Sequence, residues 1–259
     1  KKHPQNMTAY DLVLQALEPM YRLDYASFSR ARGLLQRAMM VDPGYAPAYS
    51  YAAWWHSGRI SQAWTNNIAM DATEAVRLAQ AALDREPNDA LALTVYGHQQ
   101  SYVRKEFDLA IDSFDRALTS CPNLALAWTL KGLTLCFIGD GPSALRCAQQ
   151  GHRLSPRHLN IGYAEHIVAQ AYYINGDFEQ AISWSRRSIA HSERDTSSLR
   201  TLISSLVAIG AQEEACSVAR RHREIAPQFS IREWAARSSM TESFKKSRCE
   251  RLRAAGLPQ

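Results

Sequence analysis

The residues whose types could support catalysis or ligand binding form a few small groups, and none has the spacing that its chemistry needs. Residues 139–143, in the order Gly-Asp-Gly-Pro-Ser, lack the lysine and the preceding strand of a phosphate-binding loop. A turn between two helices is the simpler interpretation. His152 with His158, and Glu165 beside His166, do not place two ligands four residues apart on a helix, as a helical zinc site requires. We therefore expect neither a nucleotide site nor a metal site.

The cysteines also give no candidate for catalysis. Cys136 and Cys147 lie in apolar helical stretches, where a buried small side chain is a more common role than a nucleophile. The five cysteines are odd in number and contain no C-x-x-C pair, which argues against a disulfide framework and favours a reducing compartment. We predict a non-enzymatic, cytoplasmic chain with no catalytic residue and no cofactor.

Composition indicates a globular chain with a basic end. Of the 259 residues, 46% are hydrophobic and 21% charged, which excludes a disordered or low-complexity protein. The net charge of +5 arises in the last part: residues 216–259 contain ten basic and four acidic residues, whereas residues 1–215 contain 20 and 21. The tail lacks the interleaved aromatic residues of a single-strand binder, so we expect a solvated face and no direct nucleic-acid contact. The most apolar stretch, residues 124–139, contains Lys131, so no membrane insertion is expected.

An internal repeat organises the sequence. Each copy has an alanine, small or apolar residues four and seven positions later, and in five of six copies a proline twelve positions later. Positions four and seven apart share one helix face, small residues there allow close helix packing, and proline ends the helix. The first alanines, spaced 44, 35, 34, 37 and 34 residues apart, are Ala31, Ala75, Ala110, Ala144, Ala181 and Ala215.

A second helix signature precedes each copy, in which an aromatic or apolar residue is followed by a small one and the stretch ends near glycine. Residues 125–139 and 168–176 are the clearest examples, and Gly139 and Gly176 suit the left-handed turn after a helix. This pairing resembles the tetratricopeptide repeat (TPR). The resemblance implies an all-α, right-handed superhelical solenoid that forms a single domain over residues 1–259. Its six expected repeats cover residues 8–43, 46–87, 90–122, 125–156, 162–193 and 196–227.

The repeat pattern has two departures. The spacing of 44 residues predicts an insertion near residues 58–70, either as a longer helix or as a protruding loop, with Asp71 as the N-cap of the next helix and Glu74 completing a capping box. Residues 230–255 are expected to form terminal capping helices with a polar outer face.

Three short sequence segments suggest a closer resemblance to one group of proteins. Residues 7–12 (Met-Thr-Ala-Tyr-Asp-Leu), 41–49 and 252–258 are similar to the C-terminal repeat region of bacterial signalling proteins that carry a class III adenylate or guanylate cyclase domain, or a winged-helix transcriptional regulator domain. The resemblance implies a regulatory, protein-binding part of a longer protein, and no segment here matches the catalytic or DNA-binding residues of those domains. A self-association module, forming a homo-oligomer through Trp64 or the basic terminal helices, and a free-standing TPR adaptor are the alternatives.

The TPR resemblance also implies a concave groove lined by first-helix residues that packing leaves free. A protein or peptide partner, or an output domain of the same chain, would bind there, with Trp54, Tyr173 and Arg200 as the strongest candidates. The full predicted set is Ser50, Trp54, Thr94, His98, Ser101, Thr129, Leu133, His166, Gln170, Tyr173, Arg200 and Ser204.

Overall fold

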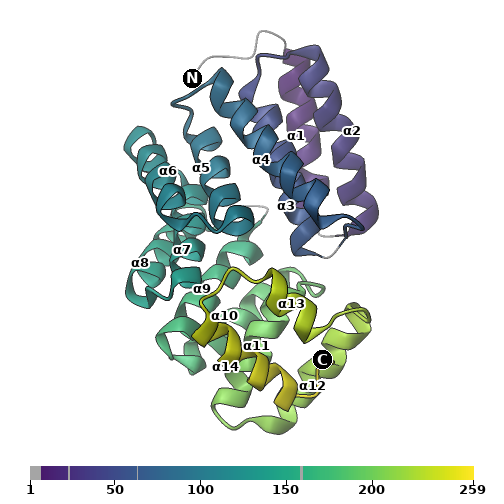
Figure 1. The fold of residues 1–259 in the computed structure, drawn as a ribbon, viewed down its shortest axis with the longest axis vertical. Coiled ribbons are helices and arrows are strands. Elements are labelled where there is room, and N and C mark those ends of the chain that lie inside the picture. Colours follow the sequence, from purple (N-terminus) through teal and green to yellow (C-terminus); the bar gives the residue numbers. More distant parts are fainter. Residues whose placement is uncertain (1–6, 23, 63, 158–159) are drawn as a thin grey trace. The chain divides into compact units, whose positions relative to one another are not determined.

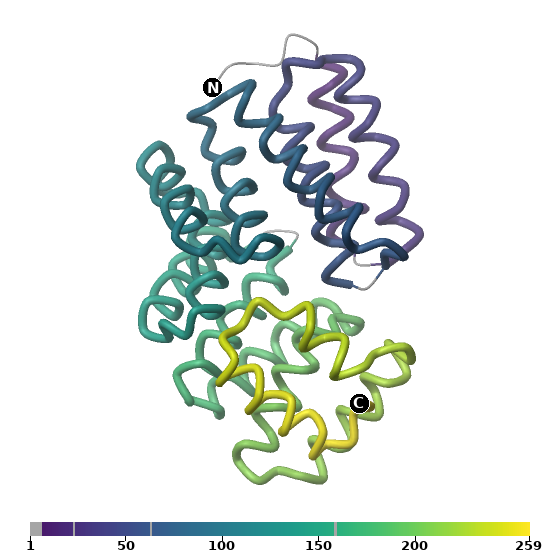
Figure 2. The backbone as a smooth tube through the Cα atoms, in the orientation of Figure 1, coloured from purple at the N-terminus to yellow at the C-terminus, as the bar shows by residue number. Residues whose placement is uncertain are grey.

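Every regular element among the described residues is a helix (Figure 1). The computed structural model describes residues 7–22, 24–62, 64–157 and 160–259, which form two compact units, residues 1–127 (unit 1) and 128–259 (unit 2). In the described part of unit 1, each helix packs on the next one in sequence (Figure 2). Its elements are α1 (Met7–Tyr21), α2 (Tyr25–Val41), α3 (Ala46–Ser61), α4 (Ile68–Arg85), α5 (Ala90–Gln99), the π-helical turn η1 (Gln100–Arg104) and α6 (Phe107–Ser120).

Unit 2 continues the same alternation and ends with two further helices. The first of its helices, α7, begins a few residues before the division between the units. The helices are α7 (Ala125–Ile138), α8 (Gly141–Leu154), α9 (Ile161–Asn175), α10 (Phe178–His191), α11 (Thr196–Ala208), α12 (Gln212–Ile225), α13 (Ile231–Arg237) and α14 (Glu242–Ala254).

The alanine stripe lies on the second helix of each pair, as the repeat predicts. All six first alanines of the repeat are completely buried. The residues four and seven positions later are buried as well, including the polar Ser185, Ser188 and His222. In the five copies that have a proline, it stands two residues beyond the end of the second helix: Pro43, for example, follows α2, which ends at Val41. The stripe therefore marks where second helices pack, and the proline marks where they stop.

Glycine closes the first helix of several pairs. Gly139, Gly176 and Gly210 have φ of +85°, +79° and +80°, the left-handed conformation that residues with a Cβ rarely adopt. The prediction of left-handed turns at Gly139 and Gly176 is confirmed. Gly132 has another role, because a Cβ there would lie 2.9 Å from the backbone nitrogen of Ala148 on α8.

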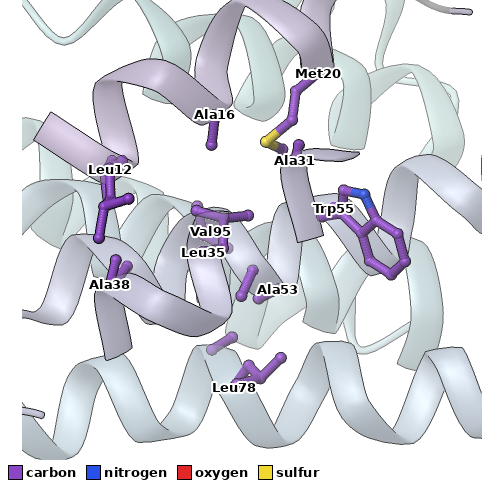
Figure 3. Packing of buried hydrophobic residues seen from close by; sticks show 14 of the residues in the cluster. Leu12, Ala16, Met20, Ala31, Leu35, Ala38, Ala53, Trp55, Leu78 and Val95 are labelled. Carbon is purple, nitrogen blue, oxygen red and sulfur yellow. The ribbon is translucent and has the colours of Figure 1, made fainter. Parts of the chain in front are cut away.

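The core of unit 1 gathers apolar side chains from α1 to α5 (Figure 3). Trp55 stacks on Phe28 with ring centroids 5.6 Å apart, and its Nε1 donates a hydrogen bond of 2.7 Å to the Phe28 carbonyl oxygen. Trp64, in the connection after α3, makes edge-to-face contacts with Phe28 and Tyr25, with ring centroids 5.2 Å and 5.9 Å apart. The connection that follows α3 is thereby held onto α2.

The extra residues of the second repeat are shared between its helices and their connection, which spans residues 62–67, whereas two residues join α7 to α8 and α9 to α10. α3 runs to Ser61 and α4 begins at Ile68, and Ala63 lies outside the described residues. The prediction that Asp71 is an N-cap is wrong. Asn67 caps α4 by accepting a hydrogen bond of 3.0 Å from the Met70 backbone nitrogen, and Asp71 lies one turn further on, fully buried.

Asp71 is buried because it has two basic partners on α3. Its Oδ1 lies 3.0 Å from Nη1 of Arg59 and 2.5 Å from Nδ1 of His56. A buried carboxylate is stable only when charges or hydrogen bonds compensate its lost hydration. The three side chains tie α4 to α3 inside an otherwise apolar contact.

We expect two glycine substitutions to change stability in opposite directions. Gly132→Ala should lower the free energy of unfolding by about 1–3 kcal/mol, because the new methyl group meets the backbone of α8. Gly33→Ala, inside α2 with no atom within 4 Å of the new Cβ, should raise it by about 0.5–1 kcal/mol. Urea unfolding monitored by circular dichroism measures both, and a stabilising Gly132→Ala would contradict the close packing of α7 on α8.

We expect Asp71→Asn to lower the free energy of unfolding by roughly 3 kcal/mol, because Arg59 would lose the carboxylate that compensates its charge. Glu74→Gln is the matched control: Glu74 pairs with Arg77 at 2.8 Å on the surface of the same helix, and such pairs contribute only about 0.3–0.5 kcal/mol. Equal losses in the two variants would show that the buried pair does not hold α4.

Candidate functional site

The twelve residues predicted to line a groove all lie on first helices, but eleven of them are buried. Ser50 and Trp54 are on α3, Thr94 and His98 on α5, Ser101 on η1, Thr129 and Leu133 on α7, His166, Gln170 and Tyr173 on α9, and Arg200 and Ser204 on α11. Trp54 is the partly exposed member of the set. Their role toward a partner stays a prediction.

In unit 1, three aromatic rings from two consecutive first helices form a stack. The His98 ring lies parallel to Tyr102 at 5.4 Å between centroids and is tilted against Trp54 at 5.0 Å. Burial lowers the pKa of His98 to about 4, so its ring is neutral at pH 7. Trp54 and Tyr102, at the two ends of the stack, remain partly exposed. The stack can therefore offer an apolar, uncharged contact.

Arg200 serves packing within unit 2. Its Nη2 donates to Ser197 Oγ at 2.9 Å, its Nη1 lies 3.5 Å from Nε2 of His222, and its guanidinium carbon is 5.4 Å from the centre of the Phe229 ring. Burial, and then the charge of Arg200, lower the pKa of His222 to about 3, so His222 stays neutral and can accept from Arg200. These contacts tie α11 to α12 and to the segment that follows α12.

The C-terminal helix α14 packs mainly on the first helix α11 (Figure 1) and also contacts residues at the end of α7 and on α9. It enters through Thr241, whose backbone nitrogen donates to the Phe137 carbonyl oxygen at 2.9 Å at the end of α7. Its far end is fixed by Gln212, whose side chain donates to the Ala254 carbonyl oxygen at 2.7 Å. The residues that α14 covers are called the α14-binding surface, and they are Phe137, Gly139, Tyr173, Phe178 and Thr201.

Three side chains of α14 make most of these contacts. Phe244 packs against Gly139, where a Cβ would approach its ring to 2.7 Å. Arg251 donates to the Tyr173 hydroxyl at 3.0 Å, and its guanidinium carbon lies 4.7 Å from the Phe178 ring centre. Arg248 donates to Thr201 Oγ1 at 2.5 Å. An aromatic side chain and two guanidinium groups, on one face of a helix, thus contact the turn after α7, the helices α9 and α11, and the start of α10.

Arg248 corrects the expectation that the basic tail is a solvated face. Only 3% of its surface is exposed, and it lies 5.1 Å from the Tyr173 ring centre and 5.6 Å from that of Trp234. Burial lowers the pKa of its guanidinium, its Nε has no hydrogen-bond partner, and it forms no ion pair with a carboxylate anywhere in the described ranges. Its charge is stabilised instead by two aromatic faces, the Thr201 hydroxyl and the Met240 sulfur, to which its Nη1 donates at 3.8 Å.

The fit of α14 on its binding surface is incomplete. An open surface pocket of about 230 Å³ lies where α14 meets the α9–α10 turn. Its walls are Tyr173, Ile174, Gly176, Phe178, Ser243, Phe244, Ser247 and Arg251. α14 therefore leaves part of the α9–α10 turn uncovered, and Phe178 and Phe244 remain partly exposed there.

Glu165 is a second buried carboxylate that sequence reasoning did not assign to a structural role. Only 1% of it is exposed, and its carboxylate lies 2.9 Å from Nη2 of Arg187, 3.4 Å from Nε2 of His191 and 3.7 Å from Nε2 of His152. These residues join α8, α9 and α10. The signal in the sequence is that Glu165 stands three positions after the small residue Gly162, so both residues lie on the same, buried face of the helix.

The described residues contain no group of three histidine, cysteine or acidic side chains placed to hold a metal ion, and His158 lies outside them. Burial raises the pKa of the Cys136 thiol, which keeps it protonated and unreactive. No helix in the described part of the chain is both long and apolar enough to cross a bilayer.

Solved structures share the fold, although no protein-family model and no curated protein matches the chain. PilW, described as a widely conserved type IV pilus biogenesis factor, superimposes with a TM-score of 0.59 at 17% identity, covering 86% of this chain and 96% of PilW. A thermophilic TPR protein from Thermus thermophilus gives 0.56 at 15% identity, covering 77% of this chain and 99% of its own.

A tetratricopeptide repeat protein from Parabacteroides merdae covers 94% of its own chain and 97% of this one, with a TM-score of 0.51 and 13% identity. At such identities the likeness concerns the fold. The chain therefore has the all-α, paired-helix fold of tetratricopeptide-repeat proteins, with about six helix pairs followed by terminal helices.

Proposed function

We propose that this chain binds a protein or peptide partner on the faces of its first helices and does no chemistry of its own. The observation that carries the proposal is the docking of α14, because a helical segment already lies on α7, α9 and α11. Side chains that accommodate one helix by aromatic contacts and a few directed hydrogen bonds can accommodate another of similar chemistry.

The first helices of unit 1 offer a comparable apolar contact. The His98 ring is stacked on Tyr102 and tilted against Trp54, and the rings of Trp54 and Tyr102 are partly exposed. Aromatic side chains fixed by their neighbours are frequent anchors of protein interfaces, because they bury a large area and lose little conformational entropy on binding.

The proposal extends to the setting in which the module works. The phrases at residues 7–12, 41–49 and 252–258 support a regulatory module of a cytoplasmic bacterial signalling protein, attached to a cyclase or a winged-helix output domain. Stacked helix pairs change curvature by small rotations between neighbours, so a partner bound to first helices can shift the equilibrium of an attached domain.

We expect a photo-crosslinking amino acid at position 54 to capture a defined protein in the source cells. Trp54→benzoylphenylalanine places the reactive group at the partly exposed end of the aromatic stack. The matched control is Gln80→benzoylphenylalanine, at an exposed position on the second helix α4. Mass spectrometry should find one adduct protein for position 54 and none for position 80. Equal adducts at both positions, or none at either, would refute binding on the first helices.

We expect the native protein to be larger than the 29.1 kDa of this chain and to contain peptides of an output domain ahead of Lys1. Intact mass and peptide mapping of the protein purified from source cells measure this directly. A native product of 29.1 kDa that begins at Lys1 would instead favour a free-standing adaptor. Light scattering of that product would then test self-association.

A further inference from the structure

We propose that residues 241–251, which are the N-cap and the first part of α14, form a displaceable occupant of the α14-binding surface. A protein partner replaces it with a helix that carries an aromatic residue and, four and seven residues later, two arginines. The inference rests on the proposed function and specifies the chemistry of its partner.

The spacing comes from α14 itself. Phe244, Arg248 and Arg251 stand at positions i, i+4 and i+7, which share one face of a helix. These side chains contact Gly139, Thr201 and the pair Tyr173 and Phe178, respectively. The neighbouring residues Glu242, Lys246 and Glu250 are exposed to solvent, so the surface does not restrict their identity.

The surface favours arginine over lysine. The Tyr173 ring lies 5.1 Å from the guanidinium carbon of Arg248 and 5.4 Å from that of Arg251, and the Tyr173 hydroxyl accepts from Arg251. A planar guanidinium can stack on a ring and donate from its edge at the same time, whereas an ammonium group cannot. Since the surface residues themselves carry no charge, binding does not depend on a matching carboxylate.

The first part of α14 is weakly held. Arg248 is buried without a carboxylate partner and with Nε unpartnered, so its lost hydration is only partly compensated. The open pocket of about 230 Å³ lies beside the same turns, so Phe244 and Ser247 are only partly covered there. Because the segment is tethered, its effective concentration keeps it in place without tight binding, and a separate partner of better fit can compete.

The end of α14 is held in another way. Leu252, Ala255 and Leu257 belong to the apolar cluster of unit 2, and the Ile231 backbone nitrogen donates to the Pro258 carbonyl oxygen at 2.9 Å. Residues 252–258 therefore stay anchored when residues 241–251 leave. The tail thus divides into a permanent cap and a mobile occupant.

The first test is hydrogen exchange of the wild-type chain. We expect the amides of residues 245–251 to exchange at least tenfold faster than those of α11, because the first turns of α14 open without global unfolding. Equal protection of α14 and α11 would overturn the proposal. This result needs no variant and no partner.

The second test is binding of a fluorescent peptide of residues 239–251 with Cys249→Ser, measured by anisotropy on the full chain. Phe244→Ala/Arg248→Ala in the chain removes two contacts of its own α14 and should raise peptide affinity at least tenfold over wild type. The matched control Lys246→Ala/Glu250→Ala, with two exposed positions of the same helix changed, should bind like wild type.

Two further variants test the chemistry. Thr201→Val in the loosened chain removes the acceptor of Arg248 with little change of shape and should lower affinity about tenfold. A peptide with Arg248→Lys and Arg251→Lys should bind more weakly than the arginine peptide. Equal affinity of all chains, or of both peptides, would overturn the proposal. The proposed function would survive that result, because crosslinking at position 54 tests it in unit 1.

Discussion

The close approach of helices along the alanine stripe is the constraint on which the rest of the structure depends. Ala31 and its five equivalents are fully buried, and the residues four and seven positions later are buried with them. Where Gly132 of α7 meets Ala148 of α8, even a methyl group would come within 2.9 Å of the backbone. Because this stripe fixes how the second helices pack, the first helices retain another face, and in unit 2 that face is where α14 lies.

Buried charge is handled in two different ways in this protein. Asp71 and Glu165 each have basic partners within 4 Å, and each joins helices of neighbouring positions in the chain. Arg248 has aromatic rings and the Thr201 hydroxyl in place of a carboxylate. Removing a partner from the first two leaves an uncompensated charge in the core, whereas releasing Arg248 to water restores its hydration. The buried contacts of Asp71 and Glu165 are therefore expected to persist, whereas the contacts of Arg248 can be exchanged for contacts with water.

The fold could be predicted from the sequence because the repeat encodes local geometry. The alanine stripe, the prolines beyond each second helix and the glycines at positive φ act within one or two helical turns. The site could be predicted less fully, since burial depends on what lies opposite. Arg200 and Tyr173 stand on first helices as predicted. However, Arg200 contacts His222 and Phe229, and α14 covers Tyr173. A repeat pattern contains no information about a non-repeating tail.

The error at Asp71 has a local cause. Asp71 stands four residues before Ala75, and the residues at the same place in two other copies, Asp140 and Asp177, are the N-caps of α8 and α10. In the second copy Asn67 caps the helix one turn earlier, so the aspartate falls inside α4 on the face of the alanine stripe. A residue that caps a helix in one copy thus becomes a buried carboxylate in another, and Arg59 and His56 compensate it.

The packing face of the basic tail is visible as a spacing pattern in the sequence. Phe244, Arg248, Leu252 and Ala255 follow one another at intervals of four, four and three, the spacing of a packing face. The net charge of the tail does not indicate this face, because most arginine side chains in proteins are solvated. Its aliphatic stem and planar head can both be buried when aromatic rings replace water. α14 thus acts as an intramolecular ligand of the α14-binding surface. The contacts of its aromatic and arginine side chains specify which external helix could take its place.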